Sequence, residues 1–219
     1  MELLHELTLG TNRMNKIFQI LFFLVFIGCA TNKSEKLQSN STINSIFNKK
    51  ESQDLQKILD FFENSICVSE NIKKENINVC YKKYFERLKQ ESEKNGNIYL
   101  KIPIDEQLKV YKNFKDSTFK EIWQLGKFFP LNTTTDTLKY YSYNFNGKYL
   151  EYLKELGKTN KAVDNYTKSF LNAGDMPPSM WASVLMDYEN YNIKDIRVKL
   201  FLAIHYLTLN DQNEREEKY

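Results

Sequence analysis

The sequence contains few of the residues that interrupt regular structure, with only 7 glycines and 4 prolines among 219 residues. β-Sandwiches and β-barrels need many turns, so this scarcity argues against those folds. An excess of one charge is also missing, because 31 basic residues accompany 28 acidic ones. A net charge of +3, without a basic run interleaved with aromatics, gives no indication of a nucleic-acid partner.

Histidine and cysteine are equally scarce, with 2 and 3 residues. We expect no metal and no cofactor, because the chain has no paired metal-ligand motif and no Gly-rich phosphate loop. Gly-x-Ser-x-Gly and His-Glu-x-x-His motifs are absent as well. His205 is a weak catalytic candidate, with Asp187 or Asp195 as its partner, although a histidine among apolar residues is more often a core residue. We therefore expect a protein that is not an enzyme.

What the sequence does contain is an apolar run at residues 17–27, behind a short basic start at Arg13 and Lys16. The run is too short to span a bilayer, which takes about 20 residues, but it suits a secretory signal. It ends in Gly28-Cys29, which resembles the lipobox of bacterial lipoprotein precursors. The resemblance implies cleavage after Gly28 and lipidation of Cys29. The mature protein would then be anchored by lipid in the cell envelope, on the periplasmic or surface face of the outer membrane.

Changes in composition divide the chain into four parts. Residues 1–28 are the signal peptide, of which 1–13 are an extension if translation begins at the second methionine. Residues 29–50 are polar at first and typical of a flexible tether. Residues 51–210 carry apolar residues at helical spacing and are expected to form one domain. Residues 211–219 are charged and expected to be disordered.

The apolar periodicity of residues 51–210 predicts an all-α domain of about seven helices, as an irregular bundle or a short α-solenoid. One helix is expected over residues 117–129. The last helix, over residues 195–209, is apolar on more than one face and should be central. Residues 139–150 are ambiguous, because Asn146-Gly147 suits a small β-hairpin, whereas Asn146 as a helix cap favours a helix. We favour the helix.

Two cysteines are left for the folded domain, Cys67 and Cys80. An oxidising envelope favours a disulfide between them, which would join two helices. Closing a loop of this length contributes about 3 kcal/mol to stability in the chain-entropy model. The alternative is two separate buried thiols.

The aromatic residues Tyr140, Tyr141, Tyr143 and Trp181 are candidate binding residues. Exposed aromatics bind glycans or protein partners, whereas the alternative is that they pack in the core. We predict a lipid-anchored protein, held to the membrane through Cys29, that acts by binding another protein. One concrete form is an immunity protein that neutralises an antibacterial toxin. A glycan-binding or structural envelope lipoprotein is the alternative, and an uncharacterised hydrolase comes third.

Overall fold

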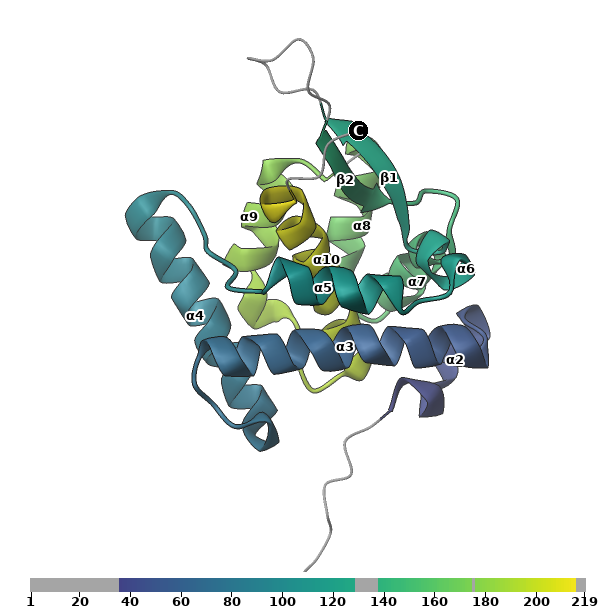
Figure 1. The fold of residues 1–219 in the computed structure, drawn as a ribbon, viewed down its shortest axis with the longest axis horizontal. Helices are drawn as coiled ribbons and strands as arrows, with labels where there is room; N and C mark the ends of the chain where they lie inside the picture. The colour runs from purple at the N-terminus through teal and green to yellow at the C-terminus, as the bar shows by residue number, and fades with distance from the viewer. Residues whose placement is uncertain (1–35, 129–137, 175, 216–219) are drawn as a thin grey trace, which may run out of the picture. The chain divides into compact units, whose positions relative to one another are not determined.

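The computed structural model describes residues 36–128, 138–174 and 176–215. Within them, the chain forms nine α-helices and one two-stranded hairpin, so the expected all-α domain with a small hairpin is confirmed (Figure 1). The elements are η2 (Leu37–Ser39), α2 (Ser41–Ile46), α3 (Lys49–Ser69), η3 (Lys74–Asn76), α4 (Ile77–Asn95), α5 (Ile104–Lys112), α6 (Asp116–Lys120), β1 (Trp123–Phe128), β2 (Leu138–Tyr143), α7 (Lys148–Gly157), α8 (Lys161–Ala173), α9 (Pro178–Met186), η4 (Tyr188–Asn190) and α10 (Ile196–Glu214). None of the helices in this part of the chain is both long and apolar enough to cross a bilayer.

α10 is the centre of the core. Every residue from Leu200 to Asp211 is buried, because the helix is apolar on all sides and has neighbours on all sides. α3, α5, α7 and β2 each pack against it, and Figure 1 shows α5 crossing in front of it. The helices therefore surround a central one, which is the irregular bundle of the two expected arrangements.

The N-terminal elements η2 and α2 belong to this domain. The side chains of Leu37 and Ile43 are fully buried, and the Leu37 N–H donates to Gln56 Oε1 over 2.9 Å. The flexible tether expected over residues 29–50 is therefore wrong from residue 36 onward, while residues 29–35 lie outside the described residues. The segment has too few apolar residues to show a period, yet those few pack against the domain.

The C-terminal end of α10 is ordered further than expected. Asp211 is fully buried, and Arg215 Nε lies 3.0 Å from both carboxylate oxygens of Asp211. This ion pair, one helical turn apart, keeps the chain in place to Arg215. The disordered tail expected over residues 211–219 is thus wrong for its first five residues, and residues 216–219 lie outside the described part.

The hairpin joins β1 and β2 in an antiparallel register from Trp123↔Tyr143 to Phe128↔Leu138. Its start is fixed to the core, because the buried Trp123 Nε1–H donates to Thr208 Oγ1 of α10 over 2.8 Å. β2 packs against α10 as well, and the Tyr141 N–H donates to Asp211 Oδ1 over 2.9 Å.

This hairpin replaces half of a predicted helix. The helix expected over residues 117–129 ends at Lys120, and the remainder forms β1. The hairpin considered near residues 139–150 exists, but its first strand comes from β1, and Asn146-Gly147 precedes α7 instead of forming its turn. The favoured helix is present from Lys148 onward. A strand and a helix are therefore both present, and they occupy successive parts of residues 139–150.

A disulfide joins the two helices of the α3–α4 pair. Cys67 and Cys80 are bonded, their Cα atoms lie 4.8 Å apart, and both side chains are buried. This agrees with the bridge expected from the sequence and not with two separate thiols. The bond fixes the end of α3 against the start of α4, which supplies one wall of the surface described next.

Candidate functional site

His205 lies in the core and not in a site. Its side chain is fully buried, and Nδ1 lies 3.1 Å from the Tyr166 hydroxyl. The rings of Phe201 and Tyr206 pack around it, and burial lowers its pKa to about 3, so the imidazole is neutral. The expected partner Asp195 instead caps α10 and pairs with its neighbour Arg197. His205 is therefore a core residue, and the weak catalytic assignment is not supported by its position.

The candidate binding residue Tyr143 is also in the core. Only 2% of it is exposed, and its ring packs against Tyr149 and Phe170. Its hydroxyl accepts a hydrogen bond from Tyr166 over 3.2 Å. Burial raises the pKa of Tyr143 to about 12, so this phenol stays protonated. Tyr143 cannot contact a ligand at the surface, and its assignment to binding is wrong.

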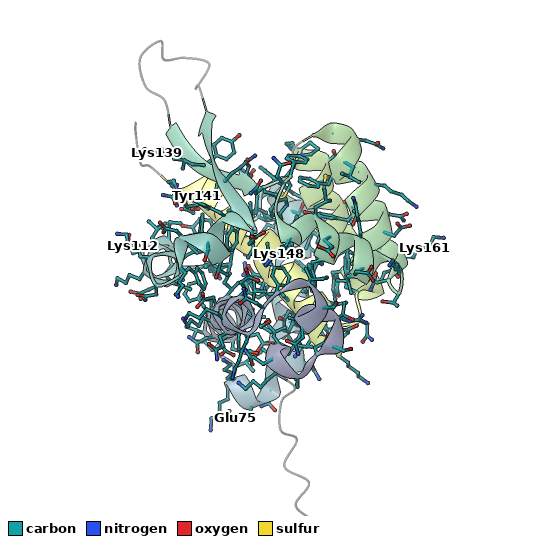
Figure 2. The ribbon with its side chains drawn as sticks, turned by 90° about the vertical axis from the view of Figure 1, so that its right-hand side faces the viewer. Glu75, Lys112, Lys139, Tyr141, Lys148 and Lys161 are labelled. Atoms are coloured by element: carbon teal, nitrogen blue, oxygen red, sulfur yellow. A yellow bond between two sulfur atoms is a disulfide. The ribbon has the colours of Figure 1, made fainter. Side chains whose placement is uncertain are left out.

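The other candidate aromatics are half-buried. Tyr141 packs its ring against Tyr111 and Phe119, and the Arg215 guanidinium lies 4.4 Å from the ring centroid (Figure 2). Tyr140 lies close to Gly126 of β1, where a Cβ would approach its ring to 2.6 Å. These two tyrosines hold the hairpin together and against the domain. They do not form an exposed aromatic surface with Tyr143.

Trp181 and Cys29 are the last two of the residues predicted to form sites. Trp181, on α9, is partly buried and packs against the core, and its buried Nε1–H has no acceptor within the part of the chain that the structure describes. Cys29, the expected lipidation site, lies outside the described residues. The same part of the chain contains no group of three or more His, Cys, Asp or Glu side chains placed to bind a metal.

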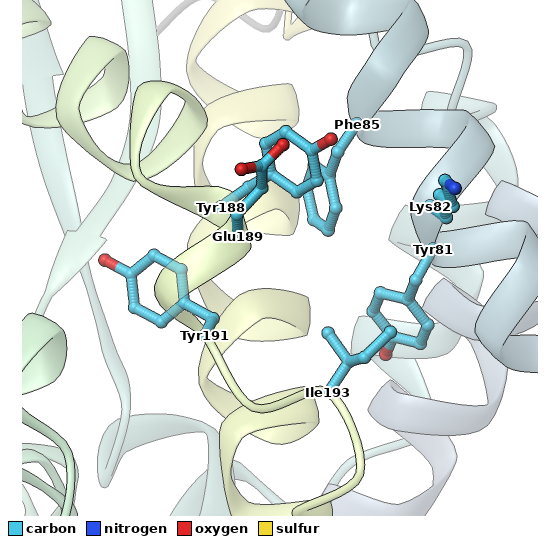
Figure 3. Close-up of a pocket in the computed structure, with 7 residues that line it drawn as sticks. All are labelled: Tyr81, Lys82, Phe85, Tyr188, Glu189, Tyr191 and Ile193. Carbon is cyan, nitrogen blue, oxygen red and sulfur yellow. The ribbon is translucent and has the colours of Figure 1, made fainter.

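A concave surface does exist elsewhere, between α4 and the connection from α9 to α10. We call it the aromatic recess, and Figure 3 shows its lining side chains. It encloses about 270 Å³. Its lining residues are Tyr81, Lys82 and Phe85 from α4, with Tyr188, Glu189, Tyr191 and Ile193 from the connection.

The walls of the aromatic recess are held by packing. Tyr188 stacks on Phe85 with ring centroids 5.5 Å apart and an interplanar angle of 29°. Phe85 and Tyr81 are almost fully buried and contact each other, so this wall is part of the core. Desolvation, followed by the charge of Glu189, raises the pKa of the Tyr188 phenol. At neutral pH the recess therefore presents a protonated phenol beside apolar rings.

Exposed apolar side chains lie close in the sequence to residues that line the recess. Val79 is 46% exposed and stands one helical turn before Lys82, while Met186 is 52% exposed and stands two residues before Tyr188. Val68 is 65% exposed and follows Cys67, which is bonded to Cys80 of α4. We call the aromatic recess with Val68, Val79 and Met186 the recess face. Exposed apolar side chains beside an aromatic recess are typical of an interaction surface.

Sequence reasoning missed the recess face for a definite reason. Tyr81 and Phe85 lie on the apolar side of α4, as the helical spacing of apolar residues in this part of the chain predicts. Tyr188 and Tyr191, however, lie in a connection without periodicity, and only the fold brings them to α4. The signal that the sequence did offer was the pair of tyrosines, Tyr188 and Tyr191, in the short connection between α9 and α10. Comparison of the chain with known protein families, curated proteins and solved structures found no match.

Proposed function

We propose that this chain is a lipid-anchored envelope protein that acts by binding another protein at the recess face. The observation that carries this proposal is the aromatic recess, together with exposed apolar side chains near its lining residues in the sequence. Protein interfaces are enriched in Tyr, Phe and Met at their buried centre, and a few such residues in a pocket supply most of the binding energy. The ring pair of Phe85 and Tyr188 is already fixed, so little side-chain entropy is lost on binding.

The expected location in the cell envelope supports this proposal. The apolar run ending in Gly28-Cys29 resembles a lipoprotein signal, and a lipid-modified Cys29 would keep the domain at the membrane. The disulfide between Cys67 and Cys80 suits an oxidising compartment outside the cytoplasm. The partner is therefore a protein that reaches the envelope.

The concrete form that we propose is an immunity protein, which neutralises an antibacterial toxin delivered into the envelope by neighbouring cells. Such a protein needs a stable domain, an envelope address and a preformed surface for one partner. Blocking the toxin requires no chemistry by the immunity protein itself. The packed walls of the recess and the exposed side chains of the recess face support the presence of such a surface.

Competition between sibling cells is the direct test, because it does not require the toxin to be identified beforehand. A strain lacking the gene is grown in contact with its wild-type siblings, and survivors are counted. We expect the deletion strain to be killed and to be rescued by the wild-type gene. Survival of the deletion strain under contact would contradict the immunity role.

Variants of the recess face then locate the binding surface. We expect Tyr188→Ala combined with Met186→Ser to abolish rescue, since this removes the ring that stacks on Phe85 and the exposed apolar side chain two residues before it. Leu125→Ser is the matched control, because Leu125 is 48% exposed on β1, against 52% for Met186. Circular dichroism and membrane fractionation confirm that each variant is folded and localised. Equal rescue by both variants would place the partner elsewhere on the domain.

A further inference from the structure

A second recess lies between the turn from α7 to α8 and the connection from α9 to α10. It encloses about 540 Å³ and is polar, unlike the aromatic recess. We call it the asparagine recess. Its lining residues are Thr159, Asn160, Lys161, Ala162 and Asn165 on one side, with Asp187, Asn190 and Asn192 on the other. Ligand sites in proteins commonly have volumes of about 300–1,000 Å³, so the space suits a small molecule.

Two of its asparagines are held by their carbonyl oxygens. Asn160 Oδ1 accepts from the Val163 N–H over 3.1 Å, and Asn192 Oδ1 accepts from the Lys194 N–H over 3.1 Å. Neither NH₂ group donates to an acceptor in the described ranges. Each amide is therefore tethered through its oxygen while its two donors stay available to a ligand.

The remaining polar side chains add acceptors and opposite charges. Across the ranges that the structure covers, the side chains of Lys161, Asn165, Asp187 and Asn190 make no hydrogen bond or ion pair. Figure 2 labels Lys161 at the outer edge of α8. One ammonium group and one carboxylate balance, so the lining is close to neutral while it is dense in donors and acceptors.

We propose that the asparagine recess binds a neutral oligosaccharide. Sugar hydroxyls both donate and accept, so they match amides that offer NH₂ groups and oxygens together with a carboxylate and an ammonium group. An anionic ligand would meet the like charge of Asp187 and a cationic one that of Lys161, so the balanced lining favours neither, and an apolar ligand would leave the amides without hydrogen bonds. This binding site goes beyond the proposed function, because no lining residue is common to the two recesses.

Saturation-transfer NMR on the full chain in detergent tests this assignment, with maltotriose, laminaritriose and chitotriose as probes. We expect at least one trisaccharide to bind, and Asn165→Ala combined with Asn190→Ala to weaken that binding by about tenfold, because two hydrogen-bonding side chains are lost. Asn172→Ala is the matched control, since Asn172 is an exposed asparagine of α8 outside the recess. Its affinity should stay within about twofold of wild type.

Three results would overturn the assignment: no transfer from any trisaccharide at about 10 mM, equal binding by the double variant, or binding of inorganic phosphate in place of the sugars. Failure here is separable from failure of the proposed function. The sibling assay depends on Tyr188 and Met186, whereas the sugar assay depends on Asn165 and Asn190. A chain that protects cells without binding sugar keeps the first proposal and loses the second.

Discussion

At the scale of single residues, the fully buried His205 shows how position decides chemistry. A histidine is a useful base when its pKa lies near 7 and a substrate reaches it. Here burial lowers the pKa of His205 to about 3, and aromatic rings surround the imidazole, with the Tyr166 hydroxyl beside Nδ1. The same burial means that protonation of His205 lowers the stability of the folded domain, which happens only at acidic pH.

We predict that acid destabilises the domain through His205. The unfolded chain takes up the histidine proton near pH 6.5, but the folded chain does so only near pH 3. Stability from this group is therefore complete above about pH 6.5 and lost as the pH falls toward 3, at up to about 1.4 kcal/mol per pH unit. Urea unfolding between about pH 4.5 and 6.5 measures this, because carboxylates titrate mainly below that window.

His205→Gln is the control for this prediction. Glutamine is neutral at every pH and offers a polar partner to the Tyr166 hydroxyl, which lies 3.1 Å from His205 Nδ1. We expect the unfolding free energy of the variant to be nearly independent of pH in the same window. Equal pH slopes in both proteins would show that another group is responsible.

At the scale of elements, the N-terminal segment illustrates what periodicity misses. η2 and α2 contain three and six residues, too few to show a helical repeat. Their contribution comes from single anchors, such as Leu37 and Ile43, and from the hydrogen bond between Leu37 N–H and Gln56. The segment is polar in composition, but its few apolar side chains hold it against the domain, so it is not a flexible tether.

We predict that Ile43→Ala lowers the free energy of unfolding by about 2–4 kcal/mol, the usual loss for truncating a fully buried aliphatic side chain. The matched control is Ser41→Ala, which changes an exposed residue two positions earlier in the same helix. Chemical denaturation of both variants measures the difference. If residues 36–50 were a flexible tether, both variants would have the same free energy of unfolding as wild type.

The hairpin marks the limit of local reasoning about elements. Phe119, Ile122 and Trp123 fit a helical pattern, yet the helix ends at Lys120. Trp123 is instead placed by its hydrogen bond to Thr208, which is 85 residues away in the sequence. An interaction at that separation cannot be read from a local pattern, and tertiary packing overrides local propensity.

At the scale of the whole molecule, the class of fold and its central helix were predictable. α10 is apolar on all sides, and only a buried position satisfies such a helix. The disulfide followed from the compartment and the short spacing of Cys67 and Cys80. The two recesses were not predictable, because each is formed by segments that the fold brings together across the sequence.

The proposed lipid anchor at Cys29 would decide where the whole protein is found in the cell. We predict that Cys29→Ser moves the protein from the membrane fraction to the soluble fraction and abolishes labelling by a radioactive fatty acid. Stable attachment takes more than one lipid chain, and all of them would be carried by this cysteine. Fractionation and labelling of the variant, beside Cys67→Ser, measure the effect. Membrane retention of unlabelled Cys29→Ser would show a different attachment.

One feature of the α9–α10 connection links the two binding proposals. Tyr188, Glu189, Tyr191 and Ile193 face the aromatic recess, while Asp187, Asn190 and Asn192 line the asparagine recess. One short stretch of backbone thus contributes side chains to both recesses. If a saccharide changes the affinity for the protein partner by some factor, the partner changes the affinity for the saccharide by the same factor. The concentration of saccharide at the cell surface would then change the affinity of the domain for its protein partner. Binding of the partner would in turn change the affinity for the saccharide.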